Sequence, residues 1–256
     1  GFGSLRDWVD DSPAHQEIFP SQNHDVAVIV YTSGTTGLPK GAMISHGNLV
    51  SNVRTLRSAW GWTEHDVMLH TLPIFHVHGL FVGLHLPLLS NSPVILMASF
   101  NADSVIKALP HATVFMGVPT YYTRLLSSGI SPKDCANMRL FTSGSAPLLS
   151  QTFTDWEQAT GTTILERYGM TETGMNTSNP LEGQRKKGTV GPPLPGVECR
   201  AVDASGMDVA PGETGDLWVR GENVFHGYWQ NAEKTAESFT DQDPVHGFFK
   251  TGDLAS

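Results

Sequence analysis

The chain has 256 residues and carries 16 Lys and Arg against 25 Asp and Glu, which gives a formal net charge of -9. An acidic chain with a single short basic cluster, Arg185–Lys187, argues against nucleic acid or an anionic membrane as a partner. Cys135 and Cys199 lie far apart and suggest no disulfide framework or zinc site, and no stretch is apolar and long enough to span a bilayer. We therefore expect a cytoplasmic protein that acts on small molecules, with its oligomeric state left open.

The first predicted elements flank a polar loop. Residues 1–25 are polar and lack periodicity, which indicates a segment leading into the fold. The apolar run 26–31 predicts a buried strand, and Ser45 is placed to cap a later helix. That helix carries one apolar stripe at Leu49, Val53, Leu56 and Trp60. We expect this stripe to pack on a sheet.

Strands and helices then alternate as far as about residue 187. The strands are predicted at 67–72, 94–98, 112–118, 139–142 and 162–165. The helices are predicted at 78–89, interrupted near Pro87, and at 102–109, 119–127 and 147–160. From residue 188 the pattern changes to short strands at 197–202 and 216–220. The sequence thus predicts an α/β fold with mostly parallel sheets covered by helices, and a small β-rich subdomain over 188–256.

The loop from Thr32 to Gly41 predicts a phosphate cradle. Its groups suited to a phosphate are Thr32, Ser33, Gly34, Thr35, Thr36, Gly37 and Lys40. Glycines let backbone N–H groups approach a ligand, hydroxyls donate to anionic oxygens, and the lysine supplies a mobile charge. The loop is not the ordinary P-loop, because Pro39 precedes Lys40 and a glycine follows it. A flexible surface loop is the alternative, which the length of the match and its Pro-Lys-Gly ending disfavour.

A second motif, Arg167 to Thr173, follows the strand predicted at 162–165. In a parallel sheet this position is at the carboxyl edge, where ligands bind. Glu172 offers the hard oxygen that Mg²⁺ prefers, Tyr168 a flat face for adenine, and Thr171 a donor to an α-phosphate. Taken alone, the motif is compatible with an ordinary turn. The small residues around Ser145 form another loop at the same edge and permit close approach of a flat ligand.

Together with 215–221 and 249–253, these blocks resemble the adenylate-forming superfamily of acyl- and aryl-CoA synthetases, luciferases and adenylation domains, over nearly the whole chain. The resemblance implies an ATP- and acid-binding core at 26–187 and a ribose-binding aspartate at Asp253. It implies catalytic roles for Lys40, Thr171 and Glu172, the last as Mg²⁺ ligand. Besides the cradle, the implied nucleotide contacts are Ser145, Glu166, Tyr168, Gly169, Thr171 and Asp253.

Two arginines point to the acid that is activated. A guanidinium is costly to bury unless it meets an anion, so Arg124 and Arg167 would select a second carboxylate if both face the pocket. For Arg124 an exposed position on its helix is the alternative. The segment 73–80 and the motif around Arg167 resemble the malonyl-CoA synthetase family, which joins malonate to CoA with ATP and has members that accept methylmalonate. The resemblance implies an acid site at His76, Arg124, Ser145, Arg167 and Met175. A metal at the H-x-H pair in 76–78 is disfavoured, since no companion ligand is in register.

The resemblance also implies missing parts. Members of the superfamily continue past the Thr-Gly-Asp block with a small C-terminal lid domain that carries a lysine, whereas this chain stops at Ser256. We therefore expect an internal piece of the large domain, without the lid and weak or inactive alone. Two other functions stay open: a CoA synthetase for another short-chain or aryl acid, and a non-catalytic ATP-binding fragment.

Overall fold

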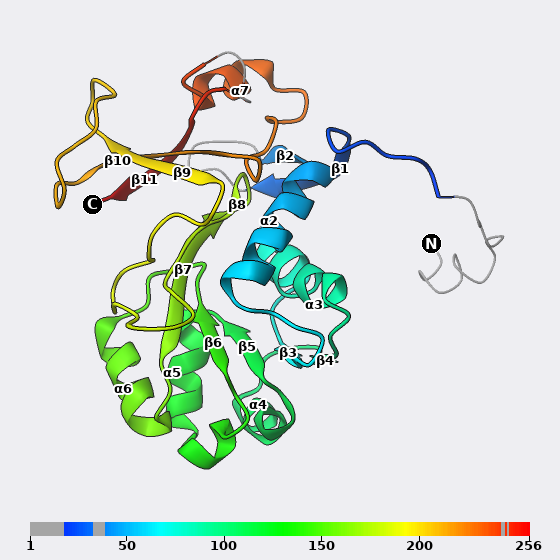
Figure 1. The fold of residues 1–256 in the computed structure, drawn as a ribbon, viewed down its shortest axis with the longest axis vertical. Coiled ribbons are helices and arrows are strands. Elements are labelled where there is room, and N and C mark those ends of the chain that lie inside the picture. Colours follow the sequence, from blue (N-terminus) through cyan, green and yellow to red (C-terminus); the bar gives the residue numbers. More distant parts are fainter. Residues whose placement is uncertain (1–17, 33–38, 242–243, 245) are drawn as a thin grey trace.

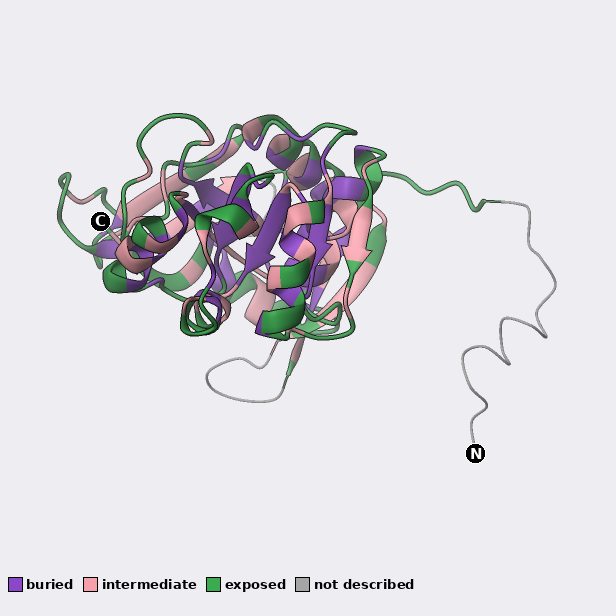
Figure 2. Ribbon diagram, turned by 90° about the horizontal axis from the view of Figure 1, so that it is seen from below, coloured by how far each residue is buried: buried purple, intermediate pink, exposed green. Residues whose placement is uncertain are grey.

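The structure is a computed structural model that describes residues 18–32, 39–241, 244 and 246–256. The described residues form sheets of two, six and three strands, with helices on both sides of the largest (Figure 1). Buried residues concentrate in the strands of that sheet and the helix faces turned toward it (Figure 2). None of the described helices has the length and apolar character needed to cross a membrane.

The two-stranded sheet is a hairpin around the predicted cradle. β1 (Val26–Thr32) pairs antiparallel with β2 (Lys40–Ser45), so Thr32 and Lys40 face each other across the ladder. The prediction that the first strand is buried is wrong: Tyr31 is 66% exposed, because β1 is paired on one edge only. The hairpin fixes where the chain enters and leaves the loop.

The helix predicted after Ser45 is confirmed as α2 (His46–Ala59). Ser45 Oγ accepts a hydrogen bond from Asn48 N, and Asn48 Oδ1 accepts one from Ser45 N, which forms a capping box. Val53, Leu56 and Trp60 of the predicted stripe are buried against one face of the six-stranded sheet. The cap and the stripe together set the position of the hairpin relative to this sheet.

The six-stranded sheet has the order β4-β3-β5-β6-β7-β8. Its strands are β3 (Met68–His70), β4 (Val94–Leu96), β5 (Val114–Gly117), β6 (Leu140–Ser143), β7 (Ile164–Met170) and β8 (Gly174–Ser178). Neighbours are parallel except β7 and β8, which confirms the mostly parallel α/β prediction. One face packs against α4 (Ala102–Ala108), α5 (Pro119–Ser127) and α6 (Ser150–Thr160); the other packs against α2 and α3 (His85–Leu89).

Three local predictions in this region are wrong. The helical break lies at Gly83–Leu84 and not near Pro87, which sits in the first turn of α3, where a missing N–H breaks no helical bond. α6 begins at Ser150 instead of 147. The strand predicted to end at 165 continues to Met170, because antiparallel pairing with β8 extends β7 beyond its parallel neighbour.

The three-stranded sheet contains β9 (Val197–Val202), β10 (Gly215–Gly221) and β11 (Phe249–Ala255), all antiparallel. With α7 (Ala232–Ser238) it encloses an aromatic cluster that also buries Ala42 of the hairpin. Backbone hydrogen bonds from Met43 N to Gly227 O and from Trp229 N to Gly41 O join this part to β2. The boundary expected near residue 188 stays a prediction, but these bonds hold residues 227–229 against the β1–β2 hairpin.

Candidate active site

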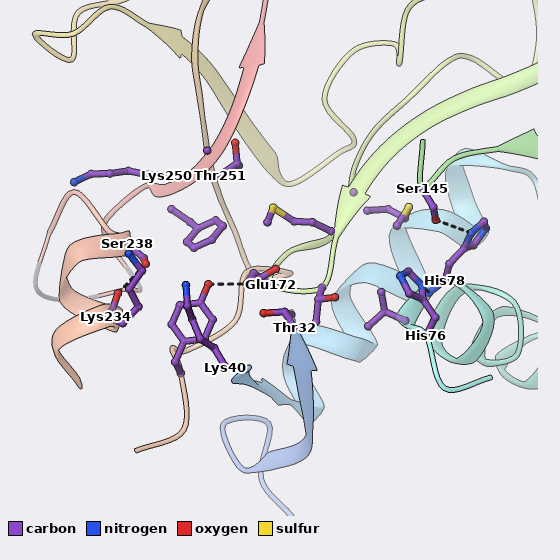
Figure 3. Close-up of a pocket in the computed structure, with 18 of the residues that line it drawn as sticks. Thr32, Lys40, His76, His78, Ser145, Glu172, Lys234, Ser238, Lys250 and Thr251 are labelled. Carbon is purple, nitrogen blue, oxygen red and sulfur yellow. Dashed lines mark hydrogen bonds between the residues drawn. The ribbon is translucent and has the colours of Figure 1, made fainter. Parts of the chain in front are cut away.

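A cleft of about 500 Å³ lies where the carboxyl end of the six-stranded sheet meets the β1–β2 hairpin, α7 and β11. Figure 3 shows two ends to it: His76, His78 and Ser145 at one end, and Lys40, Lys234 and Lys250 at the other. The two ends differ in burial and charge, so each is described separately.

Arg167 lines the first end. Its side chain is 3% exposed, and Nε and Nη2 have no hydrogen-bond partner among the described residues. Gly144 leaves the space that the guanidinium fills, since a Cβ at that position would collide with Arg167 Nη1. Burial lowers the Arg167 pKa to about 10, which still leaves the group charged at neutral pH. A buried cation without a partner, lining a cleft, is suited to an anionic ligand.

The two histidines at this end contribute no positive charge at pH 7. Burial, and then the Arg167 charge, holds the pKa of His78 well below its usual range and lowers that of His76. His78 Nδ1 lies 3.2 Å from Ser145 Oγ, and His78 N donates to His76 Nδ1 at 3.2 Å. Ser145 has a φ of 66°, in the left-handed region that is uncommon for a side chain other than glycine. Arg167 is thus the source of charge for binding an acid here.

Glu172 lies between the two ends, in the turn from β7 to β8. It is 6% exposed and accepts a hydrogen bond of 3.0 Å from Tyr228 Oη. Burial, and then the Glu172 charge, raises the Tyr228 pKa above its usual value, so this phenol stays a donor. Lys40 Nζ lies 5.5 Å from the centre of the Tyr228 ring. These contacts bring the predicted Mg²⁺ ligand and the cradle lysine onto the same tyrosine.

The donor set fits Mg²⁺ held partly by a substrate. Within the part of the chain that the structure describes, no group of three His, Cys, Asp or Glu could hold a metal by itself. Mg²⁺ is commonly bound by one or two carboxylates together with phosphate oxygens and waters. Glu172 supplies one such carboxylate beside Lys40, so the residues present suit an ion that arrives with a nucleotide.

The predicted ribose ligand is tied to the predicted adenine platform. Tyr168 Oη donates to Asp253 Oδ2 at 2.6 Å, and Asp253 is exposed next to Gly252 and Thr251, which line the cleft. Burial raises the Tyr168 pKa, and the Asp253 carboxylate raises it further. Gly169, Thr171 and Met175 also line the cleft as predicted, with Met175 buried.

Four predicted residues that the structure describes are not among those that line the cleft: Tyr168 and Asp253, which are described above, and Arg124 and Glu166. Arg124 is exposed on α5, where its guanidinium stacks 4.7 Å from the centre of Phe100; Tyr122 and Leu125 occupy the buried side of that helix. Glu166 alternates with Arg167 along β7, and its carboxylate accepts from Gly188 N at 2.9 Å. The structure therefore does not form the expected two-arginine clamp, and it turns Glu166 away from the cleft. The cradle residues Ser33, Gly34, Thr35, Thr36 and Gly37 lie outside the described residues.

Sequence reasoning missed Tyr228, Lys234 and Lys250 as residues that line the cleft. Lys250 directly precedes the Thr-Gly-Asp block, so it could have been predicted as a site residue together with that motif. Tyr228 meets Glu172 across 56 residues, a separation that leaves no local signal. Lys234 comes from a helix that the sequence pattern did not predict.

The fold and cleft define an α/β protein with a basic cleft at the carboxyl edge of a mostly parallel sheet. The chain belongs to the AMP-binding enzyme family, whose match covers residues 4–229. It is 40% identical over 282 residues to a mitochondrial malonate–CoA ligase of Mus musculus, covering 96% of this chain and 48% of that protein. It is 42% identical over 255 residues to a malonate–CoA ligase of Arabidopsis thaliana, covering 90% and 40%.

Solved structures agree with the fold. Apo MatB from Rhodopseudomonas palustris superposes with a TM-score of 0.94 at 48% identity, over 100% of this chain and 50% of that one. A malonyl-CoA ligase in a ternary product complex with methylmalonyl-CoA and AMP gives a TM-score of 0.86 at 40% identity, over 93% and 52%. The chain thus spans about half the length of these relatives.

Proposed function

We propose that the protein to which this chain belongs is an AMP-forming acid–thiol ligase for malonate. It converts malonate, ATP and CoA to malonyl-CoA, AMP and pyrophosphate. The observation that carries the proposal is the buried guanidinium of Arg167, whose Nε and Nη2 have no partner among the described residues. It lies at one end of a cleft that holds Lys40 at the other end and Glu172 between them. A site for a simple fatty or aromatic acid has no use for a buried cation at that end.

In the first step one carboxylate of malonate attacks the α-phosphorus of ATP. The bond from that phosphorus to the bridging oxygen breaks, and pyrophosphate leaves with the electron pair. Lys40 neutralises charge on the departing oxygens, and Thr171 donates to the α-phosphate. Glu172 would hold Mg²⁺, which when bound neutralises phosphate charge. No residue acts as a nucleophile, so the enzyme works by positioning two anions.

In the second step the CoA thiolate attacks the acyl carbon of malonyl-adenylate and AMP leaves. Asp253 and Tyr168, already hydrogen-bonded to each other, hold the ribose and the adenine of the nucleotide through both steps. The chain spans about half the length of its relatives, so we propose full activity for the whole protein only.

Arg167 selects the acid by binding the carboxylate that does not react. Its planar fork suits two parallel hydrogen bonds to a carboxylate, and Ser145 and neutral His76 line the same end of the cleft. Met175 bounds the acyl side. We propose methylmalonate as a second substrate, supported by the methylmalonyl-CoA complex of the relative. A role for Arg124 in the clamp stays a prediction that its exposed position does not support.

The partners that follow are small molecules, and we keep the expectation of no nucleic-acid or membrane partner. The cytoplasmic location also stays a prediction, because the mouse relative is named as mitochondrial.

Pyrophosphate exchange in the whole protein tests the function. With malonate, methylmalonate, acetate and benzoate as the acid, we expect exchange with the first two and little with the others. Preference for acetate or benzoate would favour a synthetase for another acid. Nucleotide binding without AMP formation with every acid would favour a non-catalytic ATP-binding protein.

A further inference from the structure

The residues that line the cleft are mostly basic, whereas the chain as a whole is acidic. Among the described residues that line it, four are Lys or Arg and one is acidic, although the whole chain has 16 basic against 25 acidic residues. The basic residues are Lys40, Arg167, Lys234 and Lys250, and the acidic residue is Glu172. Lys40 and Arg167 already have roles in the proposed function, whereas Lys234 and Lys250 have none.

These two lysines come from different elements and converge on one residue. Lys234 Nζ lies 3.0 Å from Glu237 Oε2, and Lys250 Nζ donates to the backbone oxygen of Glu237 at 3.4 Å. Lys234 is on α7 and Lys250 is on β11, both on the side of the cleft that holds Lys40 (Figure 3). Glu237 therefore gathers two ammonium groups at the rim nearest the cradle lysine.

Glu237 is a weak counterion for Lys234 and gives Lys250 only a backbone oxygen. Its side chain is 57% exposed and that of Lys234 is 39% exposed, so the ion pair is screened by water and contributes little stability. An ammonium group on a flexible stem can exchange such a partner for a more highly charged anion at small cost. A multiply charged phosphate at the rim would attract Lys234, Lys250 and Lys40 together.

We propose that Lys234 and Lys250 form a second anion subsite that takes the pyrophosphate group as it leaves the adenylation centre. The proposal rests on the proposed function, which supplies pyrophosphate as a product. The subsite lies beside Lys40, so the leaving group moves from the cradle to the rim without crossing the acid end. The diphosphate of CoA has the same chemistry and is the other source that the experiment must separate.

Isothermal titration of inorganic pyrophosphate into the whole protein tests the subsite. The double variant Lys234→Ala/Lys250→Ala should weaken pyrophosphate binding about tenfold, since two exposed charge pairs with the phosphate are lost. Its pyrophosphate affinity should also fall less steeply with added salt than that of the wild type. The double variant Lys234→Arg/Lys250→Arg should bind nearly as the wild type does. The matched control is Lys107→Ala/Lys133→Ala, two exposed lysines away from the cleft, which should change nothing.

Unchanged pyrophosphate affinity in the alanine double variant would overturn the proposal. Weakened CoA binding in that same variant would then assign the two lysines to the diphosphate of CoA. A thermal melt of each variant checks that it is folded. Failure of the subsite proposal can be distinguished from failure of the proposed function. If the wild type binds pyrophosphate through these lysines but never adenylates malonate, the function fails and the subsite stands.

Discussion

The two ends of the cleft carry their positive charge in different environments. At the acid end one guanidinium, 3% exposed, is held against Gly144 by the edge of a parallel sheet. At the phosphate end, lysines on a hairpin, a short helix and a strand extend into a more open rim, and the Lys234 side chain is 39% exposed. A buried charge is selective because it cannot be satisfied by water, whereas exposed charges attract any polyphosphate and are weakened by salt.

This difference predicts which end of the cleft lowers the stability of the free protein. Among the described residues, Nε and Nη2 of the buried Arg167 have no partner, so its burial costs free energy of folding, which a carboxylate would offset in the proposed function. The exposed lysines cost little in the free protein, so their loss should leave stability unchanged. Variants at each end can therefore test this difference, because they separate the effect on folding from the effect on binding.

Arg167→Met should have the largest effect. Without the guanidinium, kcat/KM for malonate should fall about 100-fold or more, the factor for roughly 3 kcal/mol lost from a buried charge pair. ATP affinity should hold within about twofold, because the Arg167 charge acts on His76, which lies at the opposite end of the cleft from Lys40 (Figure 3). The same change should raise the free energy of unfolding by about 1–3 kcal/mol, because an unpaired buried charge is replaced by an apolar side chain. Steady-state kinetics and urea unfolding measure the two effects.

Arg124→Met is the matched control. Arg124 is exposed on α5 and stacked on Phe100, so malonate use should change less than about threefold. Equal losses in the two arginine variants would restore the two-arginine clamp and contradict the assignment to Arg167 alone.

Glu172→Gln should act at the junction of the two ends. Removing the carboxylate charge should raise the Mg²⁺ concentration needed for half-maximal ATP binding about tenfold, since Mg²⁺ prefers charged oxygen ligands. Titration of Mg²⁺ against a fluorescent ATP analogue measures this shift without turnover. Glu157→Gln, an exposed change on α6, is the control. An unshifted metal titration in Glu172→Gln would remove the residue from the metal site.

The contrast between local and distant contacts also explains what could be predicted from the sequence. The cap at Ser45 and the apolar stripe of α2 depend on residues within a few turns, and both are confirmed. The extension of β7 to Met170 depends on pairing with β8, and the exposure of Tyr31 depends on which strands join the hairpin. Neither partner can be identified from a local pattern.

The candidate site shows the same limit. The motif around Arg167 and Glu172 could be predicted because its residue types match a chemistry, and both line the cleft. The orientation of Arg124 follows from which side of α5 the core occupies, and the Tyr228–Glu172 bond follows from tertiary packing. The motif residues thus predict what the site binds. The residues that pack against them, and the direction in which each side chain points, depend on the tertiary fold.

Gly144→Ala should perturb the acid end without removing any charge. The added Cβ would collide with the guanidinium of Arg167, which must shift from its position. A displaced clamp should lower kcat/KM for malonate about fivefold, because small misplacements of a binding group weaken the transition state more than the ground state. Acetate has no second carboxylate, so its slower use serves as the internal control. A loss that is equal for malonate and acetate would indicate general disruption.

The pH dependence of acid choice should give the smallest effect. Burial lowers the Arg167 pKa from its ordinary value to about 10, so the guanidinium loses its proton at lower pH than an exposed arginine would. Raising the pH from about 9 to about 10.5 should lower the malonate-to-acetate ratio of kcat/KM about fourfold, the fall in the charged fraction for that pKa. Titrations common to both acids cancel in the ratio. Stability should change in the opposite sense: the folded-state pKa lies below the unfolded one, so the penalty for burying the charge is present below pH 10 and is lost as pH rises. A ratio that stays constant to pH 10.5 would show that the carboxylate meets a solvated cation and not the buried one.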